Sequence, residues 1–178
     1  MVNSNGTVLL WDVTTGERLG KALYVSKRGV NAVAFSPDGR SLVTGGTNGT
    51  VLSWNIQTGN RLPISDNQRS VNDVAFSPDG GSVASAGADG VVVLSNLNNH
   101  TRLRLNGNQG AVRIVAFNAD GSLTAIGDRR TVNWKREDLT MPSNLRAQVC
   151  SLVSGNLTEH QWKALVPAGW PYRKICPG

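Results

Sequence analysis

A ten-residue segment occurs three times in this 178-residue chain at a constant spacing. The copies are VNAVAFSPDG from Val30, VNDVAFSPDG from Val71 and VRIVAFNADG from Val112, so each begins 41 residues after the previous one. A fixed period of this size indicates a repeat architecture, in which one supersecondary unit recurs and covers its apolar faces with its neighbours. We therefore expect a scaffold that acts through its surface and not through a catalytic pocket.

Each repeat predicts four short antiparallel strands. The first segment is followed by an apolar strand at 41–46, an Asn-Gly turn at 48–49 and a third strand at 50–55, and the second copy repeats this order with an Asp-Gly turn. Such dipeptides between β-branched runs are strong hairpin signals. A poorer fourth strand is expected at 61–64 and at 102–105. Four strands in about forty residues are typical of a β-propeller blade.

The first and last blades are predicted to be incomplete. Asn5-Gly6-Thr7-Val8 aligns with the turn and strand that begin at Asn48, so Met1 corresponds to Thr44 and only two strands of the first blade are expected. The third repeat lacks a recognisable fourth strand. We predict an all-β fold, a partial propeller of about three four-stranded blades over residues 1–136. A carboxyl-terminal part of a longer protein, a truncated reading frame and an oligomer that shares a ring all remain open as explanations.

Residues 137–178 are predicted to form a separate helical cap. Apolar side chains from Leu145 to Val153 recur at helical spacing, and Thr158 with Gln161 forms a capping box that would begin a second helix. Cys150 and Cys176 flank this second helix and are compatible either with a disulfide or with two reduced thiols. Zinc would need two further ligands. Only His100 and His160 are available, without the usual spacing, so we predict no metal and no cofactor.

Several function classes are disfavoured by the sequence. No apolar run is long enough to span a membrane, and the amino terminus does not resemble a signal peptide, which predicts a cytoplasmic protein. No GxxxxGK[ST] loop is present. The two histidines have no evident nucleophile or carboxylate partner, and most aspartates sit in Asp-Gly turns, so we predict that the chain is not an enzyme.

The repeats, together with Trp11-Asp12 and Trp54-Asn55, resemble the WD-repeat propeller family over residues 1–136. The resemblance implies a buried hydrogen-bonded set of histidine, Ser/Thr, aspartate and tryptophan in each blade. The histidine position is occupied here by Ser26, Asn67 and Asn108. At the tryptophan position, the second copy has Ser95, and the shortened third copy is matched approximately by Trp134. The set is therefore expected to be degraded. The structural blade residues that the resemblance assigns are Trp11, Asp12, Thr44, Asn48, Trp54, Ser85 and Asp89, with Asp128 at the turn position of the third copy.

The segment 140–178 is similar to the terminal segment that follows the propeller in large bacterial WD-repeat proteins. This resemblance implies a non-catalytic protein–protein interaction scaffold, or a sensor portion, of a bacterial signalling protein. Its partners would be proteins, with upstream propeller blades of a longer protein or a second copy of the chain among the candidates.

Charge gives a candidate binding surface. The formal net charge is +6, and residues 129–178 hold eight Lys and Arg against three Asp and Glu. In the family, the loops that join consecutive blades gather on one rim with the turns between second and third strands. A basic arc that binds an acidic partner is predicted there. Three alternatives remain open: a rim whose charges are only solvated, a basic tail that binds anions or nucleic acid, and a fragment without independent function. The arc residues are Lys27, Arg28, Arg69, Arg129 and Arg130.

Overall fold

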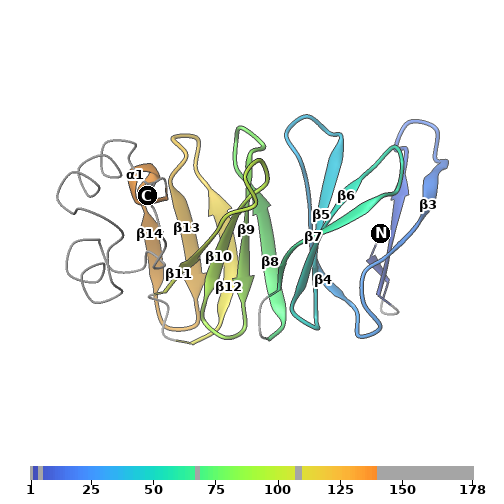
Figure 1. Ribbon diagram of the computed structural model, residues 1–178. Coiled ribbons are helices and arrows are strands. Elements are labelled where there is room, and N and C mark those ends of the chain that lie inside the picture. Colours follow the sequence, from blue (N-terminus) through green and yellow to red (C-terminus); the bar gives the residue numbers. More distant parts are fainter. Residues whose placement is uncertain (1, 4–5, 67–68, 107–109, 140–178) are drawn as a thin grey trace, which may run out of the picture.

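The computed structural model describes residues 2–3, 6–66, 69–106 and 110–139. Over these residues the chain forms four antiparallel sheets side by side (Figure 1). The predicted helical cap lies almost wholly outside them, apart from α1 (Arg136–Leu139). The strands are, sheet by sheet, β1 (Val2–Asn3), β2 (Thr7–Trp11) and β3 (Arg18–Tyr24); β4 (Val30–Phe35), β5 (Ser41–Gly46), β6 (Thr50–Asn55) and β7 (Arg61–Asp66); β8 (Val71–Phe76), β9 (Ser82–Gly87), β10 (Val92–Asn96) and β11 (Arg102–Leu105); and β12 (Val112–Phe117), β13 (Leu123–Gly127) and β14 (Thr131–Trp134).

The all-β prediction is confirmed, and the four sheets are consistent with a partial propeller. The second and third sheets have four strands, and the described part of the fourth has three. The first sheet differs from expectation because it holds three strands and not two. The additional strand, β1, pairs only Val2 with Val8 and Asn3 with Thr7, which is the register of the end of β5 on β6. It is therefore the end of a second strand.

The apolar core lies between sheets and not within any one of them. Three clusters of buried side chains occupy the three junctions. A four-stranded sheet of this size cannot cover its own faces, so each sheet depends on its neighbours for burial. The junction between the second and third sheets is filled by Ala32, Val43, Val51, Ile64, Val71, Val74 and Val83.

The first strands of the second, third and fourth sheets, which we call the inner strands, are also joined by side-chain hydrogen bonds. The Asn31 amide donates to the carbonyl oxygen of Val71 at 2.8 Å, which ties β4 to β8. Asn72 repeats this bond one sheet further, donating to the carbonyl oxygen of Val112 at 2.7 Å. Because β8 packs beside both β4 and β12, the first strands of three sheets form one row. This is the radial arrangement expected of propeller blades.

Replacing Asn72 by alanine should destabilise the chain. The substitution leaves the part-buried carbonyl of Val112 without its side-chain donor, at a cost of about 1 kcal/mol in the free energy of unfolding. Urea denaturation followed by tryptophan fluorescence measures the change. Asn133→Ala, at an exposed position on β14, serves as the matched control. Equal effects of the two substitutions would contradict a role for this bond between sheets.

Candidate interaction surface

Two kinds of loop meet at one end of the sheets. The amide of Thr47 donates to the carbonyl of Gly29 at 3.2 Å, and Ala88 donates in the same way to Ser70 at 2.9 Å. Asp128 repeats the bond to Ala111 at 3.0 Å. Each loop between sheets is thereby fixed to the turn between the second and third strands. We call this end the loop rim; its described residues are 25–29, 47–49, 69–70, 88–90, 110–111 and 128–130.

All five residues of the predicted basic arc lie on the loop rim with exposed side chains. Lys27 and Arg28 stand in the loop before β4, Arg69 in the loop before β8, and Arg129 and Arg130 in the turn before β14. None of the five forms an ion pair with a carboxylate among the described residues. Their charges are therefore presented to solvent, although no partner is present to show that they bind one.

Two acidic side chains of the loop rim are neutralised by arginines on strands. Asp128 lies 2.7 Å from the Arg113 guanidinium of β12, and Asp89 lies 3.8 Å from Arg104 of β11. The hydrogen bond from Arg113 holds the pKa of Asp128 below its ordinary value. These carboxylates therefore offset little of the charge of the loop cations, and the described rim is positive as a whole.

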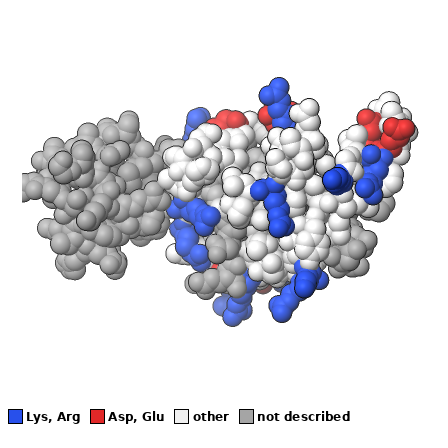
Figure 2. All heavy atoms as spheres, turned by 45° about the vertical axis from the view of Figure 1, so that its right-hand side comes forward, with Lys and Arg blue, Asp and Glu red and all other residues white. Residues whose placement is uncertain are grey.

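The opposite end of the sheets carries the acidic turns. Asp38, Asp79 and Asp120 lie in the turns between first and second strands, and Asp12 and Glu17 lie between β2 and β3. On the face drawn in Figure 2, most acidic atoms gather toward the upper end, where basic atoms also lie beside them, whereas the atoms that project from the lower end are mainly basic. The molecule is thus electrostatically polar along its strands, which is a basis for orienting a charged partner.

The turn aspartates have a structural explanation. The hydroxyl of Ser36 donates to Asp38 at 2.6 Å, and Ser77 donates to Asp79 at 2.5 Å. In the third copy the backbone amide of Ser122 donates to Asp120 at 2.9 Å. Hydrogen bonds from Ser36, Ser77 and Ser122 are the main cause that lowers the pKa of these three carboxyls.

These lowered pKa values predict acid sensitivity. A carboxyl with a lower pKa in the folded state stabilises the fold above its unfolded pKa, about 4, and loses that contribution as pH falls through the folded pKa. Melting temperature should therefore drop below about pH 4. The triple variant D38N/D79N/D120N should show a shallower drop, measured by circular dichroism from pH 7 to pH 3. An equally steep drop in the triple variant would show that these three carboxyls do not cause the acid sensitivity.

The blade hydrogen-bond set is present only in part. In the second sheet the indole of Trp54 donates to the Thr44 hydroxyl at 2.9 Å, and both residues are buried. Ser26, at the histidine position, is buried but accepts a bond from the backbone amide of Arg28 at 3.1 Å. Asn48 is exposed and accepts from Thr50 at 2.8 Å. The network therefore does not extend beyond the tryptophan and threonine through these residues.

The third sheet loses the tryptophan of the set, whereas the fourth sheet retains it. Ser95 pairs with Val83 and Trp134 with Leu123, in the same ladder position as Trp54 opposite Leu42. Trp134 thus occupies the tryptophan position, which the shorter turn before β14 obscured in the sequence. The Ser95 hydroxyl is buried and has no hydrogen-bond partner among the described residues.

The remaining assigned blade residues have local roles. The Ser85 hydroxyl donates to the carbonyl of Val93 at 3.4 Å, and Asp89 accepts from the amide of Val91 at 3.2 Å. Asp12 accepts from the amides of Thr14 and Thr15, which closes the turn after β2. Trp11 is exposed on β2, because β1 is too short to lie beside it.

The two hydroxyls of this set should respond oppositely to mutation. Thr44→Val removes the acceptor of a buried indole N–H and should lower the free energy of unfolding by about 1–3 kcal/mol. Ser95→Ala removes a buried hydroxyl without a described partner and should be neutral or stabilising. Urea denaturation compares them. A stability loss for Ser95→Ala as large as that for Thr44→Val would show that Ser95 is satisfied.

Several predicted features lie outside the described residues, namely Asn67, Asn108, Cys150, His160 and Cys176. Within the described residues, no group of three His, Cys, Asp or Glu could hold a metal ion. Nor does any helix of that part reach the length and hydropathy of a membrane span. The residues that sequence reasoning missed are Asn31 and Asn72, whose signal was their identity at the second position of the first two copies.

Comparison with known protein families identifies a repeat in the part of the chain that forms the first three sheets. The family model of the WD domain, G-beta repeat, matches residues 19–55 and 61–94, which span β3 to β6 and β7 to β10. No curated protein matches the chain. The matches support a WD-repeat family, whose members typically act as non-catalytic scaffolds for protein–protein interaction.

Proposed function

We propose that the chain is a protein-interaction scaffold whose loop rim docks an acidic segment of a partner protein. The observation that carries this proposal is the exposure, on one end of the sheets, of five cations without a described ion-pair partner. The repeat match supports the general class of function.

The loop rim is suited to this task because its backbone is held in place. The three bonds between loops and turns restrict the segments that carry Arg28, Arg69 and Arg129, so little backbone entropy remains to be lost on binding. The side chains themselves are long and mobile. Charge complementarity of this kind contributes mainly to orientation and to the rate of association.

The wider setting is part of the proposal. We place this scaffold in the cytoplasm, as the scaffold or sensor portion of a bacterial WD-repeat signalling protein, with residues 1–136 as propeller and 137–178 as a cap. The resemblance of the repeats and of the carboxyl-terminal segment supports that setting. Nucleic acid is a weaker candidate, because the described loop rim holds no aromatic side chain on which a base could stack.

Charge reversal on the loop rim tests the proposal. The variant R28E/R69E/R129E should bind a fluorescent peptide of alternating Glu and Ser at least about tenfold more weakly in 50 mM salt, with a smaller salt dependence. Arg18→Glu, Lys21→Glu and Arg40→Glu combined make the matched control, with the same change in net charge at exposed positions away from the rim.

Fluorescence anisotropy gives both affinities. Equal weakening by the two triple variants would show a net-charge effect and overturn the docking site. A single-stranded oligothymidylate that binds more tightly than the acidic peptide, with a steep salt dependence lost in the rim variant, would assign the surface to nucleic acid instead.

A further inference from the structure

Two arginines of the loop rim occupy equivalent positions in successive sheets. Gly29, Ser70 and Ala111 accept the backbone bonds that fix each loop to its turn, so these three residues correspond to one another. Arg28 directly precedes the first of them, and Arg69 directly precedes the second. Both side chains are exposed. The second and third sheets therefore each present one cation at the same place on the rim.

The fourth sheet supplies its cation from the turn and not from the loop. Gly110 stands at the position of the two loop arginines, with a φ of 102° and no side chain. The Arg129 side chain lies beside it, because a Cβ added at Gly110 would be 4.0 Å from the Cγ atom of Arg129. At the place of Arg129, the turns of the other two sheets have the uncharged Asn48 and the acidic Asp89. Each of the three sheets thus contributes one arginine, and we call Arg28, Arg69 and Arg129 the arginine row.

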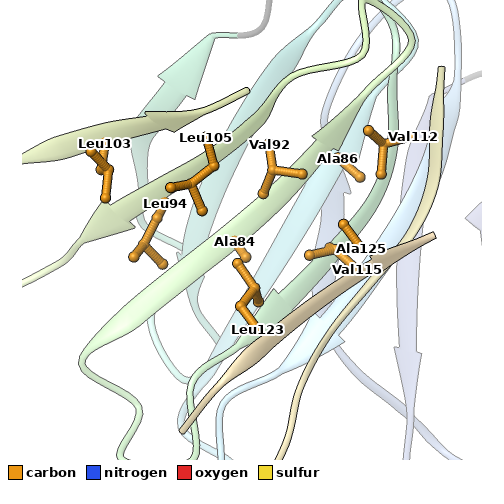
Figure 3. Packing of buried hydrophobic residues seen from close by; sticks show 10 residues of the cluster. All are labelled: Ala84, Ala86, Val92, Leu94, Leu103, Leu105, Val112, Val115, Leu123 and Ala125. Carbon is orange, nitrogen blue, oxygen red and sulfur yellow. The ribbon is translucent and has the colours of Figure 1, made fainter. Parts of the chain in front are cut away.

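The packing of the sheets sets the interval of the arginine row. Sheets packed face to face lie about 10 Å apart. Both junctions are closely packed next to the rim. A Cβ added at Gly45 would be 2.6 Å from the Cγ1 atom of Val71, and Figure 3 shows Ala86 beside Val112. Successive arginines of the row are therefore about 10 Å apart at their backbones.

This interval matches an extended chain better than a helix. Three residues of a strand cover about 10 Å, and so do seven residues of a helix. A docked helix normally lays an apolar face into an apolar groove. Among the described residues of the loop rim, no apolar side chain larger than alanine is exposed. The rim therefore lacks the anchor that a helix requires, whereas an extended acidic chain needs only the charges.

We propose that the arginine row selects its partner by the spacing of carboxylates. This inference rests on the docking function proposed above. The partner would be an extended acidic segment that crosses the sheets, with a carboxylate at every third residue and one carboxylate for each arginine. Arg69 is the middle member of the row, so it would face the central carboxylate whichever way the segment runs. Lys27 and Arg130 stand next to members of the row and would add attraction without setting the interval.

Peptides that differ only in spacing provide the first test. Each fluorescent peptide has the same length and three glutamates in a background of Ser and Gly, placed either adjacent to one another or at every third residue. Fluorescence anisotropy with the full chain in 50 mM salt should give at least about threefold tighter binding for the second peptide, because only its glutamates reach all three arginines. An alanine-rich helical peptide with glutamates seven residues apart should bind more weakly than the second peptide.

A double-mutant cycle tests the register directly. Replacing the central glutamate of the every-third peptide by glutamine should weaken binding to the unaltered chain about threefold. The same replacement should have little effect on the Arg69→Gln chain, which has already lost the matching cation. Replacing a terminal glutamate should weaken binding to both chains alike. Arg40→Gln, an equal charge change at an exposed position away from the rim, should behave as the unaltered chain does.

The outcomes separate this inference from the docking site itself. Equal affinity of the adjacent and every-third peptides, or an equal effect of the central replacement on the unaltered and Arg69→Gln chains, would overturn the register. Tighter binding of the helical peptide would also overturn it. The docking site would survive any of these results, provided that R28E/R69E/R129E still weakens the binding of every peptide. Unchanged binding by that rim variant would overturn both proposals. Circular dichroism confirms that each variant is folded.

Discussion

The structure depends on the packing of one small sheet against the next. No sheet has enough area to bury an apolar face alone, so the core consists of the side chains that meet between sheets. Close approach requires small residues on one side, as at Gly45 against Val71. Apolar β-branched residues fill the other side. The identity of a few small residues therefore decides which faces can join.

The fold could be predicted from the sequence to a large extent because its signals are local. The period of 41 residues and the Asn-Gly and Asp-Gly turns are properties of neighbouring residues, and they predicted the second and third sheets. The contacts between sheets could not be predicted in this way. Asn72 reaches a carbonyl 40 residues away, and nothing near it in sequence indicates that acceptor.

The candidate surface was predictable in position but not in its electrostatic balance. The order of loops and turns placed Arg28, Arg69 and Arg129 at one end. Neutralisation of Asp128 by Arg113 depends on pairing between strands, which the sequence does not show. The register of Trp134 was likewise hidden, because the turn before it is shorter than its counterparts. Both the electrostatic balance and the register of Trp134 therefore follow from the pairing of strands and not from the composition of the chain.

The carboxylate of Asp73 joins two neighbouring inner strands. One oxygen accepts from the amide of Val74 and the other from the amide of Val115 on the neighbouring inner strand, both at 2.9 Å. The corresponding residue of β4 is Ala32, which offers no such bond. The seam of the second and third sheets has a different second bond, which Asn31 donates to the hydroxyl of Ser70 at 2.8 Å. Two side-chain hydrogen bonds therefore close each of these two seams, but the later seam draws its second bond from strand residues alone, whereas the earlier one depends on a loop residue, Ser70.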